Sequence, residues 1–224
     1  MKITLSLLTA IAITASSSHA AIIISQYVET DSGTTPKGIE LWNTGTEEID
    51  FSISNLVVNK GVNGQALAED FTLNIGTIAA NEVIVIGTSD MGTYMDTTFG
   101  DGTAGSSSVQ YYEEGFTFNG DDSLSVVVGG VTQDVFGTPE TDPGSTWSGS
   151  GVSTQNSNIA LASGITTGDL DGWTDPSERF TTVNTTPSET GGLEGFGVAP
   201  VLIPEPSAAV LGAFGLLALL RRRR

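Results

Sequence analysis

The sequence predicts an all-β fold, an antiparallel β-sandwich or barrel, between residues 21 and 184. At least seven short segments there are rich in β-branched and aromatic residues, and turn signals separate them. No stretch from 21 to 200 shows a sustained 3.6-residue apolar stripe of helix length. The 28 Gly and 8 Pro residues follow no Gly-X-Y period, so they indicate many turns and exclude collagen.

The first half of this region contains five predicted strands. Residues 83–86 form an unbroken apolar run, which is typical of a strand buried on both faces. Asn63-Gly64 is a tight-turn pair between two of the strands. The five strands are predicted at residues 21–29, 38–43, 56–58, 71–75 and 82–87.

The second half contains a predicted hairpin, two weaker strands and a linker. Gly129-Gly130 joins residues 124–128 to residues 131–136, as in a two-residue hairpin. Weaker strand patterns follow at 158–162 and 180–183. Residues 90–108 form a Gly/Thr/Ser-rich insertion without a predicted element, and residues 185–203, rich in Thr, Gly and Pro, are expected to be a linker.

The N-terminus has the three parts of a secretory signal peptide. Lys2 supplies positive charge, residues 3–15 are apolar, and Ser18-His19-Ala20 places small residues at positions −3 and −1. Cleavage is therefore expected between Ala20 and Ala21, which removes residues 1–20. The apolar stretch is too short to span a bilayer, which favours a cleaved signal over an anchor. The alternative is an amphipathic or buried N-terminal helix.

The C-terminus joins three features within residues 204–224. Pro204-Glu205-Pro206 comes first, residues 207–220 carry no charge, and the chain ends in Arg221, Arg222, Arg223 and Arg224. Fourteen helical residues rise about 21 Å, short of the roughly 30 Å bilayer core, but Arg side chains can snorkel and extend the reach. The positive-inside rule keeps the Arg cluster cytoplasmic, so 207–220 is predicted to be a single transmembrane helix. A nucleic-acid-binding tail or a buried helix fits this order poorly.

This C-terminal arrangement resembles the PEP-CTERM sorting signal of Gram-negative bacteria. The matching residues are Pro204, Glu205 and Pro206, the apolar run and the terminal Arg cluster, combined with an N-terminal signal peptide. The resemblance implies an exosortase-type membrane protease as a partner, with cleavage near the motif. It also implies a transient stay in the inner membrane, followed by transfer to the cell surface or release. Such proteins are often associated with exopolysaccharide and biofilm.

The predicted mature protein is strongly acidic. Residues 21–203 contain three cations, Lys37, Lys60 and Arg179, against 25 acidic residues, a net charge of −22. Three scattered cations cannot neutralise a run of phosphates, which argues against a nucleic-acid partner. The absence of Cys excludes thiol catalysis, disulfides and thiolate metal sites, and the single His, His19, falls in the signal peptide.

The order of several short blocks resembles the bacterial lamin-tail domain over about residues 21–184. The blocks are ISQYVE at 24–29, GIELWN at 38–43, FNGDDSL at 118–124, QDVFG at 133–137, PGSTW at 143–147, NIAL at 158–161 and DPS at 175–177. The resemblance implies an immunoglobulin-like β-sandwich used for binding or attachment rather than catalysis. The insertion at 90–108 departs from the family.

A group of Asp residues provides the candidate metal ligands, because carboxylate oxygen suits Ca²⁺. The candidates are Asp121, Asp122, Asp169, Asp171 and Asp175. The segment that begins at Asp169 is not an EF-hand loop, since Gly172 stands at its fourth position and no Glu stands at its twelfth. Asp and Gly also dominate turns for backbone reasons, so turn formation is the alternative, and no other cofactor is indicated.

No catalytic group is indicated, and the protein is not expected to be an enzyme. Glu40 and Glu113-Glu114 could form the acid–base pair of a glycoside hydrolase, but nothing in the sequence sets their separation. No Ser nucleophile has a His base once the signal peptide is removed. Trp42, Trp147 and Trp173 could stack on sugar rings, although large aromatic residues more often belong to a core.

These observations predict an exported, exosortase-sorted protein of the cell surface or extracellular matrix with a structural or adhesive β-sandwich. The second hypothesis is a carbohydrate- or Ca²⁺-binding module, with exopolysaccharide as a possible partner. The third is a hydrolase that acts on polysaccharide.

Overall fold

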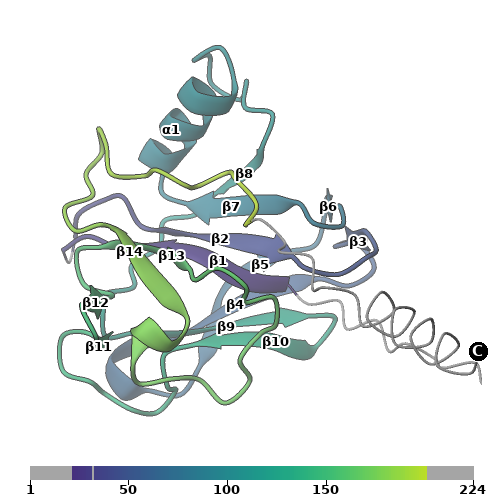
Figure 1. Cartoon of the computed structure of the whole chain (residues 1–224). Helices are drawn as coiled ribbons and strands as arrows, with labels where there is room; N and C mark the ends of the chain where they lie inside the picture. The colour runs from purple at the N-terminus through teal and green to yellow at the C-terminus, as the bar shows by residue number, and fades with distance from the viewer. Residues whose placement is uncertain (1–21, 32, 201–224) are drawn as a thin grey trace, which may run out of the picture.

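Two β-sheets pack face to face in the computed structural model, which describes residues 22–31 and 33–200 (Figure 1). The larger sheet has the strand order β14-β13-β1-β2-β7-β8, and the smaller sheet has the order β10-β9-β4-β5. The larger sheet comprises β1 (Ile22–Val28), β2 (Gly38–Asn43), β7 (Val83–Gly87), β8 (Gln110–Glu113), β13 (Asn158–Leu161) and β14 (Phe180–Asn184). The smaller sheet comprises β4 (Leu56–Gly61), β5 (Ala68–Leu73), β9 (Ser123–Val128) and β10 (Val131–Phe136).

Short elements complete the sandwich at its two ends. One two-stranded ladder joins β3 to β6, and another joins β11 to β12. One 3₁₀ turn follows β4, and a second precedes β14. Their bounds are β3 (Ile49–Asp50), β6 (Thr77–Ile78), β11 (Ser148–Gly149), β12 (Val152–Ser153), η1 (Val62–Gly64) and η2 (Pro176–Glu178).

The core between the two sheets is built on an aromatic stack. The ring of Tyr27, from β1, lies parallel to the rings of Phe118 and Phe136, with centroids 5.2 and 4.5 Å away. Trp173 meets Phe136 edge to face at 4.7 Å. Alternating aliphatic residues of β1, β2, β4 and β9 fill the rest of this layer. Aromatic side chains bury large apolar areas, so this stack supplies much of the adhesion between the sheets.

The β-rich fold predicted from the sequence is confirmed. Strands β1, β2, β7, β13 and β14 lie where the alternating segments place them, and β9 and β10 form the predicted hairpin through Gly129-Gly130. One predicted strand is shifted: β5 begins at Ala68, three residues before the predicted start, and ends at Leu73, which leaves Ile75 in an exposed turn.

The expectation of a helix-free, fully antiparallel sandwich is wrong at one edge. Helix α1 (Ser89–Phe99) lies inside the predicted insertion, and β8 pairs parallel to β7. A parallel neighbour requires a crossover connection, and α1 supplies it. The helix places Met91, Met95 and Phe99 on one face at four-residue spacing, a stripe that is hard to detect because Thr, Gly and Asp separate its members.

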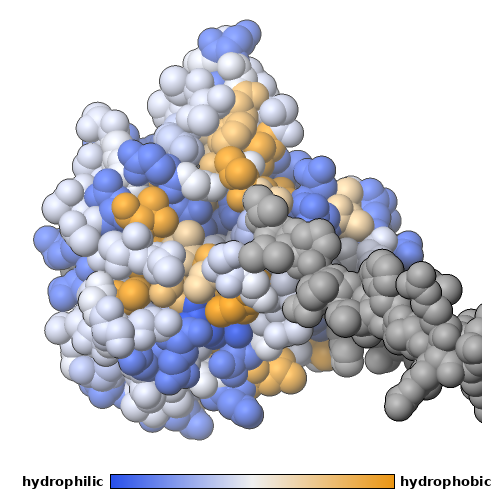
Figure 2. Space-filling model, viewed as in Figure 1, coloured by the Kyte–Doolittle hydropathy of each residue, from blue (hydrophilic) through white to orange (hydrophobic). Residues whose placement is uncertain are grey.

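The outer face of the larger sheet carries a second, smaller core. Met91 and Met95 of α1 pack there with Val28 of β1, together with Leu193 and Phe196, which are 1% and 0% exposed. Residues 192–198, here called the strap, therefore belong to the fold as far as the structure describes them (Figure 1). The expectation that residues 185–203 form a linker is wrong for the strap. Burial of Leu193 and Phe196 holds the strap on the sheet. Figure 2 shows the hydrophobic atoms of α1 beside it.

Among the described residues, no helix is both long and apolar enough to span a bilayer. The predicted signal peptide with its cleavage site at Ala20-Ala21, the motif Pro204-Glu205-Pro206, the apolar run 207–220 and the Arg cluster all lie outside the described residues.

Candidate functional site

Several cavities gather at the end of the sandwich at which β1 ends and β2 begins. Four connections meet there: residues 29–37, 114–122, 140–157 and 185–190. This surface is called the loop end below. Three cavities open on it and share lining residues, with Asp31 common to two of them and Thr34 and Thr35 common to another two.

A buried ion pair lies at the base of the loop end, between the two sides of the β1–β2 loop. The Lys37 Nζ lies 3.0 Å from Glu29 Oε1, and both side chains are almost fully buried. Lys37 also donates to the carbonyl of Thr30, and the Asn156 N–H donates to Glu29 Oε2 at 2.8 Å. Burial raises the pKa of Glu29, and the Asn156 and Lys37 donors oppose that shift. The pair therefore holds the two sides of the β1–β2 loop together and ties them to the neighbouring connection.

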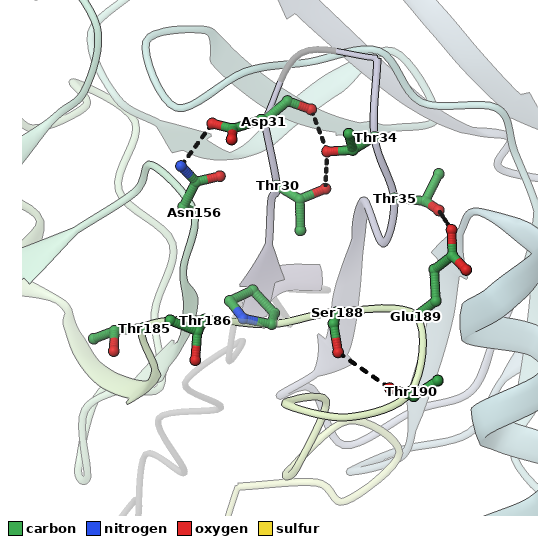
Figure 3. Close-up of a pocket in the computed structure, with 11 residues that line it drawn as sticks. Thr30, Asp31, Thr34, Thr35, Asn156, Thr185, Thr186, Ser188, Glu189 and Thr190 are labelled. Carbon is green, nitrogen blue, oxygen red and sulfur yellow. Dashed lines mark hydrogen bonds between the residues drawn. The ribbon is translucent and has the colours of Figure 1, made fainter.

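The largest cavity at the loop end, about 630 Å³, is lined mainly by hydroxyl groups (Figure 3). The Thr34 Oγ1 donates to the Asp31 carbonyl at 2.6 Å, and the Asn156 amide donates to Asp31 Oδ1 at 2.7 Å. Across the cavity, Thr35 Oγ1 donates to Glu189 Oε1 at 3.4 Å. The remaining lining residues are Thr30, Thr185, Thr186, Pro187, Ser188 and Thr190. Such a surface can exchange hydrogen bonds with a polyhydroxylated ligand.

The first two candidate metal ligands, Asp121 and Asp122, lie near the loop end but have different environments. Asp122 is buried, and its two oxygens accept from the Asn63 N–H and the Asn119 N–H, both at 2.9 Å. Burial raises the pKa of Asp122, and these two donors oppose the shift. Asp121 instead lines a smaller cavity of about 260 Å³ with Glu29 and Asp31.

The other three candidates, Asp169, Asp171 and Asp175, lie in a separate region, where the side chains of Asp169 and Asp175 serve turns. Asp169 Oδ1 accepts from the N–H groups of Asp171 and Gly172, both at 3.0 Å. Asp175 caps η2 by accepting from the Ser177 N–H at 2.8 Å. Within residues 22–31 and 33–200, no three His, Cys, Asp or Glu side chains are grouped as a metal site. The structure thus does not bring the five Asp residues together, and in this region the turn interpretation describes Asp169 and Asp175.

Two buried carboxyl groups, Asp134 and Glu40, have strongly raised pKa values. The sequence pattern named Glu40 only as a candidate hydrolase acid, and it did not single out Asp134. Asp134 of β10 accepts from the Ile24 N–H at 2.9 Å and from the Asp169 N–H at 2.8 Å, and Arg179 lies 3.5 Å away. It therefore links the smaller sheet to β1 of the larger sheet. Burial raises the pKa of Asp134 to about 6, against the lowering effects of Arg179 and the two donors.

Glu40, the other perturbed group, lies in the middle of β2 beneath the strap. Its Oε1 accepts from Ser25 Oγ and its Oε2 accepts from the Gly197 N–H, both at 2.6 Å. Burial raises the pKa of Glu40 from 4.5 to about 8, although both hydrogen bonds lower it. A buried carboxyl that the strap covers does not have the access of a hydrolase acid, whereas Glu113 is exposed at the end of β8. An acid between two apolar strand residues, as in Ile39-Glu40-Leu41, is the sequence signal for its burial.

All three Trp residues are buried, as the core interpretation predicts. Trp42, Trp147 and Trp173 are each at most 3% exposed, and the last two meet edge to face with centroids 6.3 Å apart. None of them offers a free face for stacking on a sugar ring.

Comparison with known proteins found no match among protein-family models, curated proteins or solved structures.

Proposed function

We propose that this chain is an exported β-sandwich protein, sorted to the cell surface or extracellular matrix, where it has a structural or adhesive role. The observation that carries the proposal is the order Pro204-Glu205-Pro206, uncharged residues 207–220 and four Arg, in a chain that begins with a signal-like segment. We further propose an immunoglobulin-like, lamin-tail-type sandwich and an exosortase-type protease as the processing partner. The two packed sheets are compatible with that assignment.

The charge distribution of the folded domain supports an extracellular role without a nucleic-acid partner. Each cation in the described part of the chain lies beside an acid: Lys37 with Glu29, Lys60 with Asp70, and Arg179 with Asp134. The surface consequently presents a large excess of unpaired carboxylates, which repels a phosphate backbone.

The length of the remaining chain supports processing close to the membrane. The described chain ends at residue 200, so three residues separate it from Pro204. Because Pro is disfavoured inside a helix, we expect Pro204 and Pro206 to leave the segment just before the apolar run accessible to a membrane protease.

Replacing Pro204-Glu205-Pro206 with Ala-Ala-Ala is expected to block release. The apolar anchor and the Arg cluster remain, so full-length precursor should accumulate in the membrane fraction while the mature form disappears from the medium. An immunoblot of membrane and medium fractions, in a strain that carries the sorting protease, measures both species.

Replacement of Arg221 to Arg224 with Ser is the matched control. It should loosen the topology of the anchor while leaving the cleavage motif intact. Normal release of the Ala-Ala-Ala variant would show that the tail is a simple anchor, and the sorting proposal would fail.

The hydroxyl-lined cavity favours a second candidate function, carbohydrate binding at the loop end. The double substitution Thr35→Val and Thr186→Val removes two lining hydroxyls with little change in shape. It should reduce retention of the protein on the exopolysaccharide of its own organism in a pull-down. Thr181→Val, on the exposed face of β14, is the control. Equal retention of all three proteins would argue against this site.

A further inference from the structure

Three large aliphatic side chains stand exposed on turns at one end of the smaller sheet. Ile53, Ile75 and Val131 are 83%, 66% and 62% exposed. Ile53 precedes β4, Ile75 follows β5, and Val131 begins β10. Scattered surface aliphatics are ordinary, but a group of them on adjoining turns is a candidate contact surface.

Hydrogen bonds hold these three turns side by side. The Phe51 N–H donates to the Gly76 carbonyl at 3.0 Å, which joins the first two turns. The Gly129 N–H donates to the Asn55 carbonyl at 2.9 Å, which joins the first and third. Figure 2 shows hydrophobic atoms over the β9–β10 hairpin. These turns, residues 51–55, 74–76 and 129–131, are called the tail end below.

The tail end lies at the end of the sandwich where β1 begins. Ile22 pairs with Asn43, whose side-chain amide donates to the Ile78 carbonyl of β6 at 3.2 Å. Strand β6 pairs with β3, and the turn that carries Ile53 follows β3 directly. The tail end is thus opposite the loop end.

The strap runs toward the same end of the molecule. Its first part contacts Asn158, which pairs with Val28 at the end of β1, and the amide of Asn158 donates to the Gly192 carbonyl at 2.8 Å. Its later part contacts Glu40, beside the middle of β1, through the Gly197 N–H. The described chain therefore approaches residue 200 while heading for the start of β1 (Figure 1).

The chain between residue 200 and the apolar run is short. Six residues, 201–206, precede Ser207, and fully extended they span at most about 20 Å. A domain tied so closely to a transmembrane anchor must present the end from which its chain leaves to the bilayer. The short tether also gives the domain a high effective concentration at the membrane surface, so that weak contacts are enough to hold the domain against the lipid.

We propose that the tail end rests on the lipid interface in the membrane-anchored precursor, with Ile53, Ile75 and Val131 inserted among the headgroups. The proposal rests on the anchoring role assigned above to residues 207–220. Asp50 and the exposed acids Glu47 and Glu48 lie beside these turns, so a zwitterionic surface is preferred to an anionic one.

The absence of Cys makes a single-site test direct. The full chain, processed by signal peptidase, carries Ile53→Cys labelled with an environment-sensitive fluorophore and is reconstituted into phosphatidylcholine vesicles that contain nitroxide-labelled phosphatidylcholine. Val62→Cys is the matched control, because Val62 is 41% exposed and follows the opposite end of the same strand, β4. The label at position 53 should be quenched several-fold more strongly than the label at position 62. Adding Ile75→Ser and Val131→Ser should reduce the quenching at 53 to the level at 62.

Three outcomes would overturn the proposal, and they are distinguishable. Equal quenching at 53 and 62, in protein that floats with the vesicles, rejects the docking surface and leaves the anchor intact. A chain that does not float with the vesicles rejects both. A fluorescence change at 53 that needs no nitroxide lipid, and that disappears when the protein is diluted among excess vesicles, indicates contact between two copies instead of contact with lipid.

Discussion

Replacing Glu40 with Gln is expected to abolish most of the loss of stability that the protein suffers between pH 6 and pH 8. In the folded chain, burial under the strap raises the pKa of Glu40 to about 8, whereas in the unfolded chain the group returns to about 4.5. Between these values the folded state holds a proton that the unfolded state has lost. The free energy of unfolding therefore falls as pH rises, by about 1.4 kcal/mol per pH unit, and the loss levels off once the pH passes the folded pKa.

The pH window for this measurement is set by Asp134. The pKa of Asp134 is raised from 3.8 to about 6, so its titration also lowers the free energy of unfolding, but mostly below pH 6. In the range from pH 6 to pH 8 the change comes mainly from Glu40. There the wild-type chain should lose about 2 kcal/mol of unfolding free energy that the Glu40→Gln variant keeps. Urea denaturation at the two pH values measures the difference. Glu47→Gln, at an exposed site, controls for the general effect of removing one negative charge. Parallel pH curves for wild type and Glu40→Gln would contradict the assignment.

Replacing Lys37 with Met is expected to lower the free energy of unfolding by about 3–5 kcal/mol, because it leaves the Glu29 carboxylate buried without its cation. The additional change Glu29→Gln removes that uncompensated charge and should recover a large part of the loss, although the Asn156 N–H then donates to an amide oxygen. Urea denaturation of both single variants and the double variant gives the coupling energy.

The ion pair between Lys60 and Asp70 is a matched control at the same 3.0 Å separation. Its side chains are more exposed than those of the buried pair, so Lys60→Met should cost no more than about 1 kcal/mol. If both Lys→Met variants lose the same stability, burial is not what distinguishes the two pairs.

The sequence pattern predicted the two-sheet body because strand signals are local. Each of these signals depends on only a few neighbouring residues, and the structure confirms each of them. They are the alternation at 38–43, the apolar run at 83–86 and the Gly129-Gly130 turn. The crossover helix and the strap depend instead on long-range packing. Phe196 lies in a stretch of Gly and Glu, and its burial is decided by contacts with α1 and β1 rather than by its neighbours in sequence.

The candidate site was harder to predict for the same reason. The Asp residues chosen as metal ligands share a short sequence pattern, yet Asp122 and Asp169 direct their oxygens to backbone N–H groups. Glu29 and Lys37 are eight positions apart and gain their importance only when the β1–β2 loop closes over them. Their pairing could not be distinguished in sequence from that of two exposed charges.

The central position of β1 has a consequence for how the chain acquires its structure. The side chain of Gln26 bonds to that of Asn158, 132 residues later, and β1 lies between β2 and β13 in the larger sheet. Pairings so distant along the chain are slow to form, since the entropy of loop closure must be overcome first. A chain threaded through a membrane pore from its N-terminus would expose β1 early and complete its pairing only after residue 161 has passed. In an exported chain, this topology would delay folding until most of the chain has crossed the membrane.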